Sequence, residues 1–296
     1  MAKKLYNDCF DKFLFDCEGF KEKSSRLSVI LENSNSPTIR DRANKIYRCG
    51  TLLQFGVSDD DITLDNANFC RQRLCPMCQW RRSRRLYADL SALWERLIAD
   101  GYNFVHVVLT VRNVCADDLD GTINRMYRNF SRMLHDNAFS HVQGAIRFLE
   151  VTYNAQGDNY HPHLHVLLVV RKSYFTSRYY ISHALLVSLW RQYMRLDYDP
   201  LCHIGKADSD SIAEVSKYCV KPFDFDALDW RTELLVYETL DIALHGRRMI
   251  QTYGVIRSIM RELKIDLESD EEDVSLVDSD VMTLQYNALT RRYDFI

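Results

Sequence analysis

The stretch HPHLHVLLVV, residues 161–170, places histidines at alternate positions immediately before an unbroken apolar run. Such a run, bounded by polar residues, predicts a buried β-strand. Side chains two positions apart lie on one face of a strand, so His163 and His165 point the same way, and His161 joins them if the strand continues through Pro162. Two parallel imidazoles on a rigid sheet supply half of a metal site.

The segments around this strand are predicted to follow the order β-α-β-β-α-β. Strands are expected at 104–111, 145–153, 161–170 and 201–207, and helices at 123–136 and 184–194. This is the order of the ferredoxin-like split βαβ fold, an antiparallel α+β class. Right-handed crossovers place the first and third strands at the centre, with the second strand beside the third. Glu150, on the second strand, is therefore expected next to the histidines.

Glu150 shares a strand face with Phe148 and Thr152, and a carboxylate in such a setting needs a partner. With His163 and His165 it would form a site of three ligands and open positions. Such a site suits a catalytic divalent ion that must also bind substrate oxygen. The alternative is a carboxylate at an exposed edge that pairs with an arginine.

The segment SIAEVSKYCVKP, residues 211–222, predicts a helix that ends at its proline. Glu214 and Tyr218 are four residues apart and share one helix face, with Lys217 and Lys221 on or near it. A tyrosine phenolate can attack a phosphodiester and form a covalent phosphotyrosine. Its ordinary pKa is about 10, so a metal ion and lysines would be needed to stabilise the phenolate.

Each residue of this helix also has a structural interpretation. The chain has 17 tyrosines, so Tyr218 could be a packing residue. Ser211-x-x-Glu214 fits a capping box, in which the glutamate only closes the start of the helix.

A second cluster, CRQRLCPMCQWRRSRR at 70–85, combines cysteines with six arginines and no acidic residue. The spacing of Cys70, Cys75 and Cys78 predicts a structural zinc site. Cys49 is our choice of fourth ligand, with Cys9 and Cys17 as alternatives, and free core cysteines are the other interpretation. A helix is expected over 81–100. The arginines of this segment are expected to contact DNA phosphates. The alternative is a basic helix face that is only exposed to solvent. These arginines are Arg71, Arg73, Arg81, Arg82, Arg84 and Arg85.

The composition, 47% hydrophobic with a net charge of −3, indicates a globular protein. The charge is uneven, because DLESDEED at 266–273 carries six acids in eight residues and is expected to form a loop. No apolar run of membrane-spanning length and no signal sequence are evident, so a cytoplasmic protein is expected. We expect a zinc- and DNA-binding region at 1–100, a catalytic domain at 101–225 and a helical region at 226–296.

Four motifs together resemble the HUH endonucleases, in particular the single-tyrosine initiators of plasmid rolling-circle replication. HLHVLL resembles their His-hydrophobic-His motif, EVSKYCVKP their tyrosine motif, VVLTVRN at 107–113 their first motif, and the cysteine-rich segment a region upstream in one branch. The resemblance implies an HUH fold, Tyr218 as nucleophile, and His163, His165 and Glu150 as ligands of Mn²⁺ or Mg²⁺. It implies that Glu214 activates water for termination. Pro222 stands one turn past Tyr218, which disfavours a second tyrosine in this helix.

The resemblance further implies nicking of one strand of a plasmid origin, a covalent 5′-phosphotyrosine, and rejoining at termination. The implied partners are double-stranded and single-stranded origin DNA and the host helicase and replication machinery, with no membrane. The sequence leaves the oligomeric state open, with a homodimer as one alternative. Two other hypotheses remain open: an HUH relaxase or single-strand transposase, and a non-enzymatic zinc-containing DNA-binding repressor.

Overall fold

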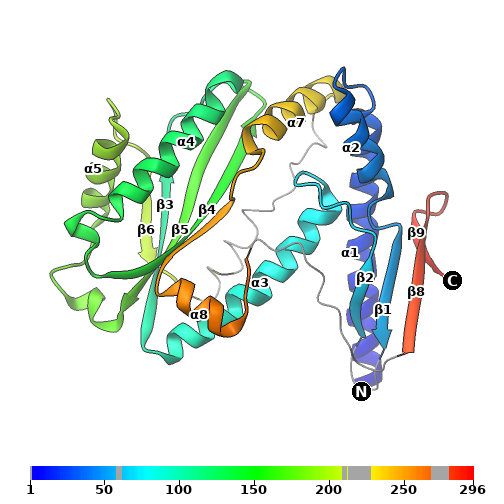
Figure 1. The fold of residues 1–296 in the computed structure, drawn as a ribbon, viewed down its shortest axis with the longest axis horizontal. Helices are drawn as coiled ribbons and strands as arrows, with labels where there is room; N and C mark the ends of the chain where they lie inside the picture. Colours follow the sequence, from blue (N-terminus) through cyan, green and yellow to red (C-terminus); the bar gives the residue numbers. More distant parts are fainter. Residues whose placement is uncertain (1, 58–61, 209–211, 213–227, 268–279) are drawn as a thin grey trace. The chain divides into compact units, whose positions relative to one another are not determined.

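The computed structural model describes residues 2–57, 62–208, 212, 228–267 and 280–296 (Figure 1). It consists of two compact units. Unit 1 comprises 1–82, 224–238 and 270–296, and unit 2 comprises 83–223 and 239–269. Two helices, α3 (Pro76–Ala99) and α7 (Trp230–Leu244), have residues in both units.

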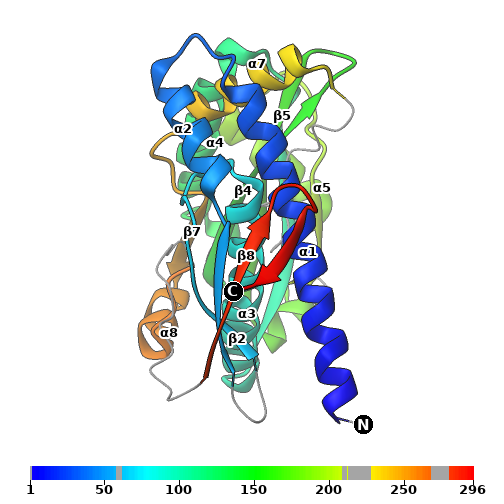
Figure 2. The ribbon, with the colours of Figure 1, turned by 90° about the vertical axis from the view of Figure 1, so that its right-hand side faces the viewer.

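Unit 1 contains an antiparallel sheet of four strands in the order β2-β1-β8-β9. The strands of this sheet are β1 (Leu52–Val57), β2 (Ile62–Ala67), β8 (Asp280–Asn287) and β9 (Arg292–Phe295). Unit 1 also contains the helices α1 (Ala2–Leu31) and α2 (Pro37–Arg48). Figure 2 shows the C-terminal hairpin of β8 and β9 beside β1. This sheet therefore pairs the strands of residues 52–67 with the C-terminal strands of residues 280–295.

Unit 2 contains an antiparallel sheet of five strands in the order β6-β3-β5-β4-β7. Its strands are β3 (Tyr102–Thr110), β4 (Val142–Asn154), β5 (Asn159–Arg171), β6 (His203–Lys206) and β7 (Ile250–Gly254). Its helices are α4 (Ala116–Met133), α5 (His183–Met194) and α8 (Ile256–Leu263), with short 3₁₀ turns η1 (Asn137–Phe139) and η2 (Lys172–Thr176). The predicted α+β class is confirmed. The predicted arrangement of four strands is confirmed as well: β3 and β5 lie at the centre, with β4 beside β5.

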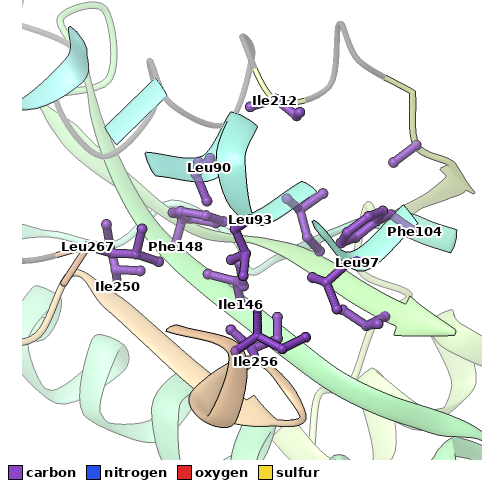
Figure 3. Packing of buried hydrophobic residues seen from close by; sticks show 14 of the residues in the cluster. Leu90, Leu93, Leu97, Phe104, Ile146, Phe148, Ile212, Ile250, Ile256 and Leu267 are labelled. Carbon is purple, nitrogen blue, oxygen red and sulfur yellow. The ribbon is translucent and has the colours of Figure 1, made fainter. Parts of the chain in front are cut away.

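Strand alternation gives the sheet of unit 2 two buried faces. One face carries Phe104, Ile146 and Phe148 and packs against α3 and α8, as Figure 3 shows for Leu93 and Ile256. The stacking of Trp94 on Phe104, with ring centroids 3.9 Å apart, fixes α3 on this face. The leucines of α3 recur every three to four residues, as the sequence predicts.

The opposite face of the same sheet packs against α4, whose buried side chains include Ile123, Met126 and Phe130. The indole Nε1 of Trp190 on α5 donates a hydrogen bond of 2.8 Å to the carbonyl of Thr110, which ties α5 to β3. A buried indole needs such an acceptor. Both faces are thus covered by helices, and the polar groups within them require partners.

The stretch expected to be a helical region at 226–296 contains strands as well as helices. β7 pairs with β4, and β8 pairs with β1 more than two hundred residues earlier in the chain. Five-residue and eight-residue strands carry weak local signals, and their pairing partners are distant in sequence. The helix expected over 81–100 begins earlier, at Pro76, because proline suits the first turn of a helix.

Gly254 ends β7 with a φ of +62° and shows why a glycine is needed there. A Cβ atom at this position would lie 2.2 Å from the carbonyl oxygen of Gln143. The close approach lets β7 join the edge of β4 and turn directly into α8.

The helix expected at 211–222 lies outside the described residues, apart from Ile212. Residues 268–273 of the acidic segment lie outside them as well.

Candidate functional site

Glu150, His163 and His165 come together on neighbouring strands of unit 2. In the register of β4 and β5, Glu150 lies directly opposite His163. The Nε2 atoms of His163 and His165 donate hydrogen bonds of 2.5 and 3.0 Å to the same oxygen, Oε2 of Glu150. Glu150 and His165 are buried and His163 is half-buried, and their metal-binding atoms lie within 4.8 Å of one another. We call this group the His-Glu centre.

The donor set of the His-Glu centre fits a divalent metal ion. Burial alone would raise the pKa of Glu150, but hydrogen bonds from His163 and His165 outweigh it and lower that pKa to about 2. The carboxylate is therefore ionised at neutral pH, which is the form that binds a cation. Two imidazole nitrogens and one carboxylate oxygen leave open positions on a metal ion of higher coordination number.

His106 of β3 was not singled out in the sequence, yet it contacts the His-Glu centre. Its Nε2 lies 3.3 Å from Nδ1 of His165, and its side chain is buried. A second group that holds the other nitrogen of a metal-binding histidine fixes its tautomer and ring orientation. The available signal was a single imidazole within the apolar strand FVHVVL, residues 104–109.

His161 does not belong to the His-Glu centre, although it precedes His163 at the same two-residue spacing. Its Nδ1 hydrogen-bonds to Oδ1 of Asn113 at 2.8 Å. Burial, followed by the neighbouring His163, lowers its pKa. His161 is therefore bound to the loop after β3 and not to Glu150.

The cysteines form a second group, in unit 1. The sulfurs of Cys49, Cys70, Cys75 and Cys78 lie within 4.8 Å of one another, and all four are free thiols. The Sγ atom of Cys78 is 3.5 Å from that of Cys49 and 3.6 Å from that of Cys70. Tetrahedral zinc with Zn–S bonds of about 2.3 Å requires sulfurs roughly 3.8 Å apart. The group, called here the four-cysteine cluster, fits structural zinc.

The four thiols cannot all ionise without a cation nearby. Hydrogen bonds with Cys70, Cys75 and Cys78, together with burial, raise the pKa of Cys49. A divalent ion at the centre would bind all four as thiolates. Cys17, an alternative fourth ligand, is buried outside this group, and the side chain of Cys9 lies outside the described ones.

A buried cation, Lys21, lies near the four-cysteine cluster. Only 1% of Lys21 is exposed. Its Nζ donates a hydrogen bond to the carbonyl of Tyr47 and lies over the rings of Tyr47 and Tyr286. Burial lowers its pKa, and the electrostatic influence of Cys49, Cys75 and Cys70 opposes that effect. Four thiolates around one Zn²⁺ carry a net charge of −2, which a lysine there partly neutralises.

The arginines of the cysteine-rich segment have different settings. Arg82 donates hydrogen bonds of 3.0 to 3.5 Å to the backbone carbonyls of Arg71, Gln72 and Arg73, so it supports the loop between the cysteines. Arg81 stacks 4.6 Å from the ring centroid of Phe69. Arg71 and Arg84 are exposed, and Arg73 is half-buried. Nε of Arg85 lies 3.7 Å from Oδ2 of Asp89, one helical turn further along α3. Arg82 therefore has a structural contact that the sequence pattern did not indicate.

The remaining predicted site residues, Glu214, Lys217, Tyr218 and Lys221, lie outside the described residues. Their roles stay predictions.

Comparison with known proteins identifies the family. Residues 61–295 match the model of the Replication protein family. A "Protein rep" of Bacillus sp. is 35% identical over 82% of this chain and 86% of its own length. Proteins of the same name from Lactiplantibacillus plantarum and Bacillus amyloliquefaciens are 30% and 32% identical, over 86% and 82% of their lengths. No solved structure matches.

The chain belongs to the Replication protein family, and this membership confirms the resemblance to plasmid replication initiators. Among the helices of the described ranges, none combines the length and the apolar character that a membrane span requires.

Proposed function

We propose that this protein initiates rolling-circle replication of a plasmid by a metal-dependent nick in one DNA strand at the origin. The observation that carries the proposal is the His-Glu centre, where Glu150 receives hydrogen bonds from both His163 and His165. A buried carboxylate between two imidazoles is costly unless it is strongly paired or binds a metal ion. Family membership gives DNA replication as the context.

The chemistry assigned to Tyr218 is a transesterification. The tyrosine gives up its proton, and its oxygen attacks the scissile phosphorus, which forms a tyrosine–phosphate bond. The bond to the 3′ oxygen breaks, and this oxygen takes a proton to become the 3′-hydroxyl primer. A divalent ion held by the His-Glu centre would polarise the phosphate and offset its developing charge. The energy of the broken ester is retained in the phosphotyrosine, so strands can later be rejoined.

Glu214 is assigned to termination. It lies one helical turn from Tyr218 in the predicted helix, so a water molecule activated by its carboxylate could cut the returning strand. Glu214→Gln should nick normally but accumulate products longer than one plasmid. A Glu214→Gln protein that terminates normally would leave Glu214 as the capping residue of its helix.

The zinc- and DNA-binding region would hold origin DNA for the catalytic domain. Exposed arginines beside a zinc-bound loop suit contacts with a phosphate backbone, and Lys217 and Lys221 would add to the charge at the nick site. On this proposal the protein acts in the cytoplasm on origin DNA, together with the host helicase and replication machinery.

The experiment is a nicking assay on supercoiled origin plasmid with Mn²⁺ or Mg²⁺. We expect relaxed circles that carry covalently bound protein, and loss of both with EDTA, Tyr218→Phe or His163→Ala. His161→Ala is the matched control, because His161 lies on the same strand but outside the His-Glu centre. Origin binding without any relaxed circles would favour the repressor hypothesis. Nicking at a conjugative or transposon end instead of the replication origin would favour a relaxase or transposase.

A further inference from the structure

A cleft in unit 2 collects arginines that the proposed chemistry does not use. It has a volume of about 610 Å³ and is lined by ten residues from α4, β4 and the chain around β7. Five of the ten are arginines and none is acidic; they are Arg128, Arg132, Arg147, Arg247 and Arg248. We call this the arginine cleft. Its size is typical of ligand sites.

The inner part of the arginine cleft is rigidly built. Arg147 on β4 is 3% exposed, and its guanidinium stacks 3.4 Å from the ring centroid of Tyr127. The carbonyl of Arg248 accepts hydrogen bonds from both Arg147, at 3.1 Å, and the hydroxyl of Tyr127, at 3.0 Å. Arg247 is fixed by Asn124 and by an ion pair with Asp120, a neighbour that does not line the cleft. These contacts join α4 to the chain entering β7.

The rim of the cleft is exposed and cationic. Arg128, Arg132 and Arg248 are exposed, and none of them forms an ion pair with another residue in the described ranges. Arg128 and Arg132 are four apart on α4, so they project from the same helix face. Tyr253, half-buried and hydrogen-bonded to Ser131 at 3.1 Å, adds an aromatic ring beside them. Spaced cations next to an aromatic ring are the features of single-strand nucleic-acid grooves.

The arginine cleft lies close to the His-Glu centre along the chain but on the other face of the sheet. Arg147 and Glu150 are three residues apart on β4, so their side chains point to opposite faces. The distance along the strand is about 10 Å. β7 is the edge strand next to β4. Its ladder with β4 ends at Phe148, and one further backbone hydrogen bond joins Leu149 to Met249, so Glu150 lies just beyond the paired segment. A strand of a few nucleotides could pass around this edge.

We propose that the arginine cleft binds the phosphodiester backbone of single-stranded DNA. The charges are spread over a helix turn and the start of a strand, which suits successive phosphates better than one small anion. The choice of DNA as the polymer rests on the proposed function. The test measures binding alone, so its outcome and that of the nicking assay are independent.

The experiment follows the fluorescence anisotropy of a labelled 20-nucleotide oligo-dT, which lacks the origin sequence, at several salt concentrations. Arg128→Glu and Arg132→Glu should each weaken binding about five- to tenfold and reduce the salt slope by about 0.7 per lost phosphate contact. Arg125→Glu is the matched control. It lies on the same helix, is exposed, makes the same charge change and does not line the cleft. It should bind within twofold of the unaltered protein.

Equal effects of Arg125→Glu and Arg128→Glu would overturn the proposal, as would no effect of Arg128→Glu in a protein whose unfolding temperature is unchanged. Competition separates a polymer from a small phosphate ligand. Unlabelled oligo-dT should displace the probe at far lower phosphate concentration than dTMP or inorganic phosphate. Displacement by dTMP or inorganic phosphate at equal phosphate concentration would show a small-anion site and overturn the assignment to DNA.

Discussion

Replacing His106 with phenylalanine should weaken metal binding at the His-Glu centre without removing a ligand. Nε2 of His165 donates to Glu150, and in the neutral imidazole Nδ1 of His165 would accept a hydrogen bond from His106. If His165 held a metal ion through Nε2, its proton would reside on Nδ1, and His106 would accept the hydrogen bond. His106 can support either tautomer, because its own Nε2 can donate or accept.

The magnitude follows from burial of this hydrogen bond. His165 is 4% exposed and His106 is 8% exposed, so in His106→Phe the Nδ1–H group of metal-bound His165 would lose its acceptor in a site shielded from water. An unsatisfied buried donor costs about 1–3 kcal/mol. That corresponds to a loss of metal affinity of roughly 5- to 150-fold, which includes the range of about 10- to 100-fold typical of groups that hold metal-binding histidines.

Calorimetric titration of the metal-free protein with Mn²⁺ measures this affinity directly. His106→Gln should retain part of it, because the amide oxygen can accept the hydrogen bond, and His161→Phe, outside the centre, should leave it unchanged. The reasoning is refuted if His106→Phe binds Mn²⁺ as tightly as the unaltered protein while remaining fully folded.

Three other predictions concern the four-cysteine cluster and the His-Glu centre. Cys78→Ser, or chelation of zinc, should lower the unfolding temperature and release one zinc equivalent, as judged by calorimetry and metal analysis, whereas Cys202→Ser should do neither. Lys21→Met should speed zinc loss to a chromogenic chelator about tenfold relative to the exposed control Lys23→Met, because a buried positive charge near the thiolates is removed. The pKa of Glu150 is depressed to about 2, so its carboxylate stabilises the metal-free fold above pH 4.5 and loses this effect as the pH falls toward 2. Glu150→Gln should therefore flatten acid unfolding in that window, by on the order of 3 kcal/mol, and an unchanged profile would contradict the assigned hydrogen bonds.

Short-range sequence patterns were sufficient to predict the arrangement of the His-Glu centre on β4 and β5. The alternation in HPHLHVLLVV placed His163 and His165 on one face of β5, and crossover handedness placed Glu150 on the adjacent strand. The first follows from the alternation of side chains along a strand, and the second from the right-handedness of crossover connections, which leaves few topologies. The cysteine spacing likewise indicated three members of the four-cysteine cluster, because Cys70 and Cys75 precede α3 and Cys78 lies in its first turn.

The sequence by itself determined the α+β class, the order of four strands and the residue types that gather in the two clusters, since each depends on periodicity or close spacing. Only the tertiary structure decided what long-range contacts bring together. Those contacts place His106 beside His165, Lys21 near the cysteines, β8 beside β1, and the arginines of α4 beside those before β7. Each of these contacts joins segments distant in sequence. The free energy that selects them comes from burial and hydrogen bonding across the folded chain, which no local pattern encodes.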